Sequence, residues 1–176
     1  MTKRDHIEFQ ERSVAKAFLI TFRAYGTWLH GDERGSVDRR HYNRFGTSKI
    51  RPNTDTVERR TDQLKDVPFL LGAKERQIVE KAIKEVCQVR EYVLFALHVR
   101  TNHAHVVAHG PAKPERMMDS FKAYSTRALR DAGLISSDRR PWSRHGSTRY
   151  LWTDEHINKA VDYVINGQGD ELPAFD

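Results

Sequence analysis

Hydrophobic and polar positions along the chain predict alternating strands and helices. The run 18–25 is rich in β-branched and aromatic residues and predicts a strand. A second strand is expected at 92–99, and after a turn at 100–102 the segment 103–110 returns as its antiparallel partner. The short apolar run 150–152 predicts one more strand.

Two central segments carry apolar residues at helical spacing. The first helix is expected at 73–91, and the second from Pro114, a natural first-turn residue, to Ala132, with Gly133 as its stop. Cys87, the only cysteine of the chain, falls within the first helix and is expected in the core. The residues predicted to face the core are Val79, Ala82, Ile83 and Val86 in the first helix and Met117, Phe121, Ala128 and Leu129 in the second.

The last predicted helix, at about 153–169, carries an unusual tyrosine. Thr153 is a good N-cap, and acidic residues follow in the first turn, where the helix dipole favours them. On a helical wheel Tyr163 lies roughly 110° from the centre of the apolar stripe, so core packing explains it poorly. The stripe consists of Ile157, Ala160, Val161 and Val164.

The segment 27–72 has no sustained periodicity and is predicted to be irregular. A loop of that length is more often functional than idle, although a solvated insertion is the alternative. Its mixture of basic and aromatic residues suits contacts with a nucleic-acid backbone and base stacking. The residues are Arg34, Arg39, Arg40, Arg44, Lys49, Arg51, Arg59 and Arg60, with Trp28, Tyr42 and Phe45 between them.

The order strand, helix, strand, strand, helix, strand, helix predicts an α+β fold of the ferredoxin-like (RRM or palm-like) type, an antiparallel sheet with helices packed on one face. We expect a single domain over 1–176, with a basic insertion at about 27–72 and a C-terminal tyrosine helix at about 153–169.

Composition narrows the class of protein. A net charge of +6 and a pI near 9.5 are typical of proteins that bind polyanions. No apolar run approaches the length needed to cross a bilayer, and the charged N-terminus lacks the apolar core of a signal peptide, so we expect a cytoplasmic protein with no membrane partner.

Two histidines carry the candidate chemistry. His103 and His105 alternate along a predicted strand, so both imidazoles can point to one face and bind a divalent metal ion. With a side-chain oxygen as third ligand the site would accept Mg²⁺ or Mn²⁺, although two histidines suit Zn²⁺ or Ni²⁺ at least as well. An exposed tyrosine such as Tyr163 could then attack a DNA phosphate and form a covalent phosphotyrosine.

Other residues have less specific interpretations. His98 is expected to be an ordinary histidine with its own partner, and His109 lies too far along the strand to share the metal. Tyr124 is the rival nucleophile, since it lies among basic residues of the second central helix. The residues expected to contact DNA, or else to form a solvated surface, are Lys122, Arg127, Arg130, Arg139, Arg140, Arg144 and Arg149.

Three segments together resemble the single-tyrosine HUH transposases, especially the REP-associated tyrosine transposases and their insertion-sequence relatives. These segments are the predicted hairpin at 102–106, the helix at 121–127 and the final helix at 162–168, and the resemblance runs from Phe18 to Gly169. It implies that the paired histidines bind a divalent ion, that the tyrosine of the last helix cleaves single-stranded DNA beside a hairpin, and that an amide about one turn later completes the metal site.

Carried over to this chain, the resemblance implies that His103 and His105 are ligands, that Tyr163 is the nucleophile of a 5′-phosphotyrosine intermediate, and that Gln168, or Asn166 as the alternative, is the third ligand. It also implies Mg²⁺ or Mn²⁺ as cofactor, single-stranded DNA with hairpins as partner, and either a homodimer or a monomer. The chain departs from the family pattern in the small residue between the histidines and in Gly167, four residues after the tyrosine.

The sequence leaves three functions to compare. The first is a metal-dependent transposase that cuts and joins single-stranded DNA. The second is a non-catalytic, domesticated protein of the same fold that binds single-stranded DNA or RNA hairpins, which the small Ala104 and the displaced amide would suit. The third is a small metal hydrolase, which the lack of an acidic residue near the histidine pair makes the weakest.

Overall fold

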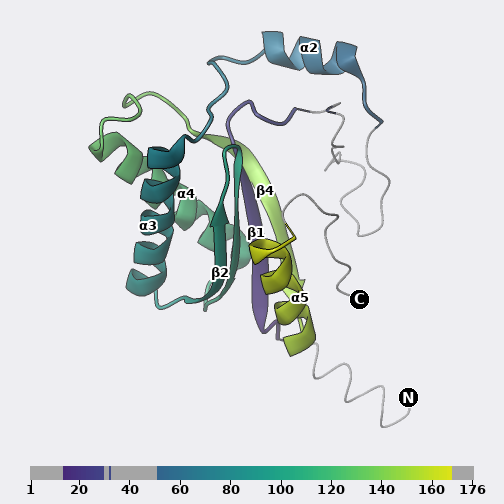
Figure 1. Ribbon diagram of the computed structural model, residues 1–176, viewed down its shortest axis with the longest axis vertical. Coiled ribbons are helices and arrows are strands. Elements are labelled where there is room, and N and C mark those ends of the chain that lie inside the picture. Colours follow the sequence, from purple (N-terminus) through teal and green to yellow (C-terminus); the bar gives the residue numbers. More distant parts are fainter. Residues whose placement is uncertain (1–13, 30–31, 33–50, 168–176) are drawn as a thin grey trace.

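The computed structural model describes residues 14–29, 32 and 51–167. Within these ranges the chain forms four strands and four helices around one sheet (Figure 1). None of the described helices is long and apolar enough to cross a membrane. In chain order the elements are β1 (Ala17–Ala24), α2 (Thr54–Asp62), α3 (Ala73–Val89), β2 (Val93–Val99), β3 (His103–His109), α4 (Pro114–Asp131), β4 (Trp142–Leu151) and α5 (Asp154–Ile165).

The strands form one antiparallel sheet in the order β2-β3-β1-β4. The largely buried strands β1 and β3 are central, and the more exposed strands β2 and β4 form the edges. This order, with α3 and α4 as the two crossovers, is the ferredoxin-like arrangement, and the predicted fold class is confirmed.

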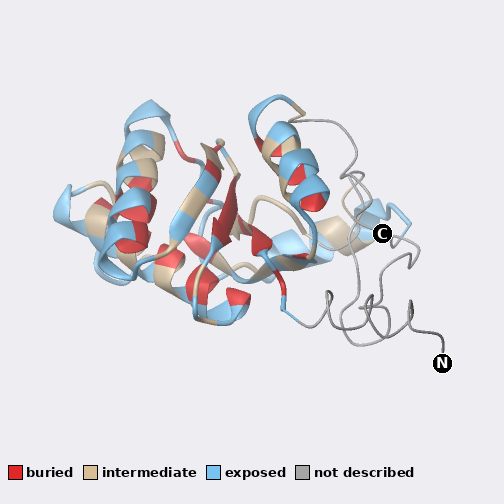
Figure 2. Cartoon of the chain, turned by 90° about the horizontal axis from the view of Figure 1, so that it is seen from below, coloured by how far each residue is buried: buried red, intermediate tan, exposed pale blue. Residues whose placement is uncertain are grey.

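Helices cover both faces of the sheet, which corrects one detail of the predicted fold. Side chains of β1 alternate: Phe18, Ile20 and Phe22 join the larger core with α3 and α4, whereas Ala17 and Leu19 join a smaller core with α5. Because the central strands are apolar on both sides, one layer of helices cannot bury them. Figure 2 shows that the buried residues of the flanking helices lie on the sides that face the sheet.

The predicted central helices are confirmed in position and orientation. In α3 the buried residues recur at helical spacing and include Cys87. The helix α4 begins at Pro114 and is followed by Gly133, whose φ of 68° belongs to the left-handed region that glycine adopts without strain. Met117, Phe121 and Leu129 are fully buried on the face turned to the sheet. Ala128, which was also predicted to face the core, is only partly buried.

Strand β4 is much longer than the predicted 150–152. Its sequence WSRHGSTRYL lacks the alternation of a half-buried strand, because an edge strand leaves most of these side chains partly or fully exposed. It pairs with β1 through backbone hydrogen bonds, with a shift of register between Phe22 and Ala24. Gly146 permits the close approach, because a Cβ there would clash with the Met118 sulfur and the Thr21 carbonyl.

The segment 27–72, predicted to be irregular, contains the helix α2. No residue of α2 is buried, so no apolar stripe reveals it. The local signal is Asn53, whose side chain accepts a hydrogen bond from the Thr56 backbone N–H at 3.0 Å and caps the first turn. Residues 30–31 and 33–50 of the predicted basic insertion lie outside the described residues, as do 1–13 and 168–176.

Candidate active site and nucleic-acid interface

His103 and His105 lie on β3 with their rings on the face covered by α5. Their ring centroids are 4.6 Å apart. Ala104, between them, points the other way and is fully buried in the larger core, as the alternation of a strand requires. The small residue that departs from the family pattern therefore occupies a core position and does not disturb the histidine pair.

Each of the two rings has its Nδ1 atom held by an oxygen. His103 Nδ1 lies 2.7 Å from the side-chain oxygen of Asn102, and His105 Nδ1 lies 2.6 Å from the hydroxyl of Thr21 on β1. An amide oxygen only accepts, so Nδ1 of His103 is a donor; the Thr21 hydroxyl can accept in the same way. This tautomer leaves the Nε2 lone pair of each ring for a metal ion, and such oxygen partners orient metal-binding histidines.

Burial keeps His105 neutral. It lowers the pKa of His105 to about 3, with smaller contributions from the positive charges of His103, His98, Arg23 and Arg100. A histidine that stays neutral well below pH 7 is always in the form that binds metal.

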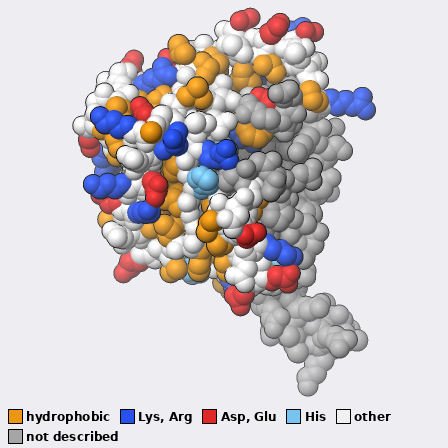
Figure 3. Space-filling view, in the orientation of Figure 1, with side chains coloured by type: hydrophobic (Ala, Val, Ile, Leu, Met, Phe, Trp, Pro, Cys, Tyr) orange, Lys and Arg blue, Asp and Glu red, His pale blue; other side chains and the backbone are white. Residues whose placement is uncertain are grey.

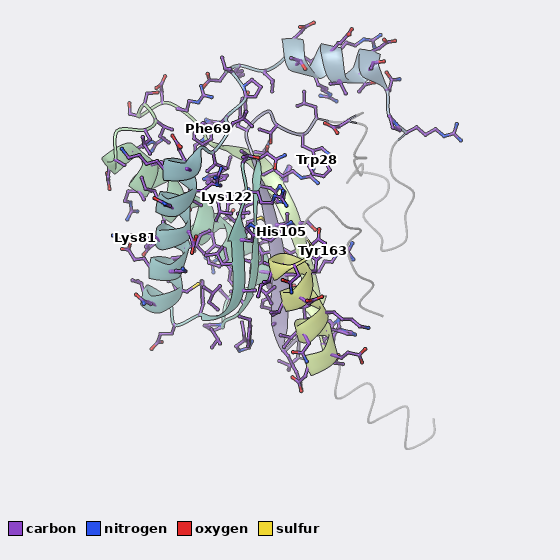
Figure 4. The ribbon with its side chains drawn as sticks, in the orientation of Figure 1. Trp28, Phe69, Lys81, His105, Lys122 and Tyr163 are labelled. Carbon is purple, nitrogen blue, oxygen red and sulfur yellow. The ribbon has the colours of Figure 1, made fainter. Side chains whose placement is uncertain are left out.

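Tyr163 lies against this histidine pair. Its ring centroid is 5.5 Å from that of His105 with the planes at 74°, and Figure 4 shows the two side chains at the junction of α5 and the sheet. Tyr163 is half-buried and packs on the smaller core, so core packing accounts for more of this residue than the helical wheel predicts. The long side chain reaches the sheet from the flank of the helix, and its contact with His105 is what distinguishes it.

Two hydrogen bonds fix the helix that carries Tyr163. At its start the Thr153 hydroxyl accepts from the His156 backbone N–H at 3.1 Å, which confirms the predicted N-cap. Near its end His98 Nδ1 lies 3.0 Å from the Val164 carbonyl, which confirms that His98 is a histidine with its own partner. The second bond satisfies one of the terminal carbonyls that a helix leaves without an internal donor.

The two candidate third ligands have different outcomes. Gln168 lies outside the described residues. Asn166 is the exposed C-cap of α5, and its amide nitrogen donates to the Asp162 carboxylate at 2.8 Å. Within the described ranges no group of three His, Cys, Asp or Glu side chains is placed to hold a metal ion, so two imidazoles are the donors that the geometry brings together.

Tyr124, the rival nucleophile, lies on α4 and packs against the larger core, on the sheet face opposite to the histidine rings. The guanidinium of Arg127 is 5.4 Å from its ring centroid. The contact with His105 therefore favours Tyr163 over Tyr124 as the candidate nucleophile.

Lys122 and Arg139, which were both expected to contact DNA, make several hydrogen bonds within the chain. Lys122 Nζ donates to the carbonyls of Ser143, Arg144 and His145 at 2.9, 3.4 and 3.2 Å, in the part of β4 where the register shifts. Arg139 pairs with the Asp66 carboxylate at 2.8 Å and donates to the Val67 carbonyl at 2.6 Å. These contacts give both side chains a role in joining segments of the fold.

The other predicted DNA contacts come from α4, from the segment before β4 and from β4 itself. Arg127 and Arg130 are exposed on α4, and Arg140 and Arg144 are exposed before and within β4. Arg149, opposite Leu19 on the neighbouring strand, lies on the α5 face. In Figure 3 the basic side chains are interspersed with acidic ones. Their role in DNA binding stays a prediction.

Sequence reasoning missed the residues that surround the histidine pair. On the α5 face, β1 changes from Leu19 to Thr21 and Arg23, and β3 changes from Val107 to His105 and His103 in register with it. The apolar stripe of α5 packs over the apolar half of this sheet face, which includes Leu19 and Val107. The histidine pair lies in the polar half of the same face. The loss of apolar character at every second position of neighbouring strands was the signal that could have found these residues.

Solved structures and a family model resemble this chain. The chain is similar to the structure of a REP-associated tyrosine transposase bound to a REP hairpin, with 14% identity and a TM-score of 0.49 over 86% of this chain; it spans 66% of the length of that chain. It is also similar to a proposed transposase from Deinococcus radiodurans R1, with 10% identity, a TM-score of 0.44 and coverage of 90% and 94% of the two chains. No curated protein matches.

The family model described as "Transposase IS200 like" matches residues 68–165, which is more than half of the chain. The matched region runs from the segment before α3 to the end of α5 and includes both histidines and Tyr163. The chain therefore belongs to the IS200-like transposase family.

Proposed function

We propose that this chain is a metal-dependent nuclease and strand transferase that cuts single-stranded DNA next to hairpins through a 5′-phosphotyrosine at Tyr163. The observation that carries the proposal is the contact between Tyr163 and His105, at 5.5 Å between ring centroids, beside a second histidine on the same strand. A tyrosine nucleophile and two imidazole ligands are thus within reach of one phosphate group.

The two histidines fit a divalent cation. Both have Nδ1 engaged by an oxygen, which supports binding through Nε2, and the low pKa of His105 keeps its ring unprotonated. Bound Mg²⁺ or Mn²⁺ would polarise a phosphate oxygen and make the phosphorus more electrophilic. The remaining ligands would be an amide oxygen of Gln168 or Asn166, phosphate oxygens and water.

The proposed cleavage exchanges one ester bond for another. The Tyr163 hydroxyl oxygen forms a bond to phosphorus while the bond from phosphorus to the 3′ oxygen breaks. The phenol loses its proton, and the departing 3′ oxygen gains one and becomes a hydroxyl. Because the phosphotyrosine keeps the ester, a new 3′ hydroxyl can reverse the reaction and join another strand without a nucleotide cofactor.

The proposed substrate follows from the half-buried position of Tyr163. A phenol held between a helix and a sheet is more accessible to a single strand than to a duplex. Membership of the IS200-like family is the basis for the hairpin beside the cut. Phosphate contacts would come from the exposed Arg127, Arg130, Arg140 and Arg144, with Arg149 on the α5 face.

The proposal is tested with labelled hairpin-bearing oligonucleotides that cover the DNA flanking the gene. We expect cleavage and a protein-linked product with Mg²⁺ or Mn²⁺, and neither with EDTA or in His103→Ala. We also expect that a second oligonucleotide with a 3′ hydroxyl is joined to the linked strand. Hairpin binding without cleavage, unchanged by EDTA and by His103→Ala, would instead support the non-catalytic binding protein.

A further inference from the structure

On the sheet face that α5 covers, the polar region extends beyond the histidine pair. Arg23 lies opposite His103 on the neighbouring strand, two positions after Thr21 and on the same face. Its guanidinium lies 3.6 Å from the ring centroid of Trp28, in the segment that follows β1. An arginine stacked on an indole therefore lies beside the proposed metal ligands, on residues to which the proposed chemistry gives no role.

We propose that Arg23 and Trp28 form a nucleotide subsite, in which the Arg23 guanidinium binds a backbone phosphate of single-stranded DNA and the Trp28 indole stacks on the adjoining base. The proposal rests on the proposed function, since it concerns the strand that would reach Tyr163.

The geometry of the pair suits this role. An arginine that lies over an aromatic ring can donate from the N–H groups at the edge of its guanidinium to phosphate oxygens. The guanidinium takes one face of the indole, and a base would stack on the opposite face. Trp28 is partly exposed at the same end of the sheet as His105 (Figure 4).

The segment between Arg23 and Trp28 is held against the turn between β2 and β3. The Ala24 backbone N–H donates to the Asn102 carbonyl at 2.8 Å, and the Thr27 hydroxyl lies 2.9 Å from the Ala24 carbonyl and 3.3 Å from that of Asn102. Asn102 is also the residue that orients His103. A subsite built on this segment is fixed relative to the metal ligands, which limits the ordering cost of binding.

A second arginine lies at this end of the sheet. Arg100, in the turn just after β2, has its backbone N–H bonded to the His103 carbonyl at 2.8 Å. With Arg23 it brings two cations to the rim of the histidine pair, and both act on His105. Arginines grouped around a site of phosphate chemistry attract the substrate backbone and hold it close to the reacting group.

The test uses the full chain with Tyr163→Phe, so that binding is measured without cleavage, and follows tryptophan fluorescence during titration with a single-stranded oligonucleotide and Mg²⁺. We expect quenching that is lost in Trp28→Phe, which keeps a stacking ring but not the indole, and kept in the matched control Trp152→Phe. Trp28→Ala is expected to weaken binding about tenfold. Arg23→Gln should weaken it similarly and lower the salt dependence by about one phosphate contact.

Oligonucleotides with one abasic site separate stacking from a merely structural role. An abasic site at the stacked position should weaken binding to the parent about as much as Trp28→Ala does, and should weaken Trp28→Ala little further. The inference is overturned if no single-stranded DNA quenches the parent, or if Trp28→Ala and Arg23→Gln bind as the parent does. In chains that keep Tyr163, a normal adduct in Trp28→Ala and Arg23→Gln would overturn the subsite alone, whereas no adduct in the unmodified chain overturns the proposed function.

Discussion

His98 Nδ1 donates a hydrogen bond to the Val164 carbonyl at 3.0 Å, and so joins the sheet to the residue that follows Tyr163. His98 also lies directly opposite His105 in the sheet. His98 therefore links α5, which carries Tyr163, to the part of the sheet that carries His105. The position of α5 on the sheet depends on this hydrogen bond near the end of the helix and on apolar packing along the remainder of the helix.

The first prediction concerns this bond. His98→Leu leaves the Val164 carbonyl without its donor, which costs about 1–3 kcal/mol and loosens the end of α5. We expect formation of the Tyr163 adduct to slow about tenfold, while Mn²⁺ affinity measured by calorimetry changes little. His98→Asn, whose amide nitrogen can take the place of Nδ1, should recover most of the rate. An adduct rate in His98→Leu equal to that of the parent would contradict this role.

The second prediction concerns the Thr21 hydroxyl, 2.6 Å from His105 Nδ1. Thr21→Val keeps the shape of the side chain but removes the oxygen that orients the ring, and loss of such a partner typically weakens metal binding 10- to 100-fold. Thr21→Ser keeps the hydroxyl and serves as the control. Calorimetric titration with Mn²⁺ measures the effect, and equal affinities in Val and Ser variants would show that the hydroxyl has no part in orienting His105.

The third prediction is a pH dependence of stability without metal. The pKa of His105 is about 3 in the folded chain and near 6.5 when unfolded. Between these values the unfolded chain binds a proton that the folded chain does not, so His105 lowers the free energy of unfolding as the pH falls through this window. In urea denaturation with EDTA, the parent should lose stability from pH 7 to pH 4 more steeply than His105→Gln. Parallel pH profiles would contradict the burial of a neutral His105.

The fourth prediction separates structural from DNA-binding basic residues. Arg139 bonds to Asp66 and Val67, so Arg139→Gln should lower the melting temperature with a smaller effect on DNA affinity. The exposed Arg140, its neighbour, should behave in the opposite way: Arg140→Gln should leave stability within about 0.5 kcal/mol and weaken DNA binding. Thermal melts and salt-dependent DNA titrations give both quantities, and the reverse pattern would refute the distinction.

Local patterns predicted α3, α4 and α5 well because each of these helices has its own signal. The apolar spacing in α3 and α4, Pro114 at the start of α4 and Thr153 before α5 all act over a few residues. The antiparallel pair β2 and β3 could be predicted for the same reason, since both strands and their turn lie within 93–109. These features indicated the ferredoxin-like order of elements.

The parts that sequence reasoning missed depend on distant partners. Strand β4 has no apolar alternation and forms because β1 offers it a backbone edge, and Lys122 satisfies its carbonyls. The second helical layer depends on Leu19 and Val107 sharing a face, which requires the register of β1 and β3. The histidine pair could be predicted from spacing alone, whereas its partner Thr21, 84 positions away, could not.

The central claim is that Tyr163 is the residue that becomes linked to DNA, and mass spectrometry of the linked peptide tests it most directly. After reaction with a hairpin oligonucleotide and Mg²⁺, nuclease and protease digestion leaves a peptide that carries a short nucleotide remnant. We predict the remnant on Tyr163, attached through a 5′ phosphate, and its complete loss in Tyr163→Phe but not in Tyr124→Phe. A remnant on Tyr124 or on any other residue, or an adduct that persists in Tyr163→Phe, would contradict this account.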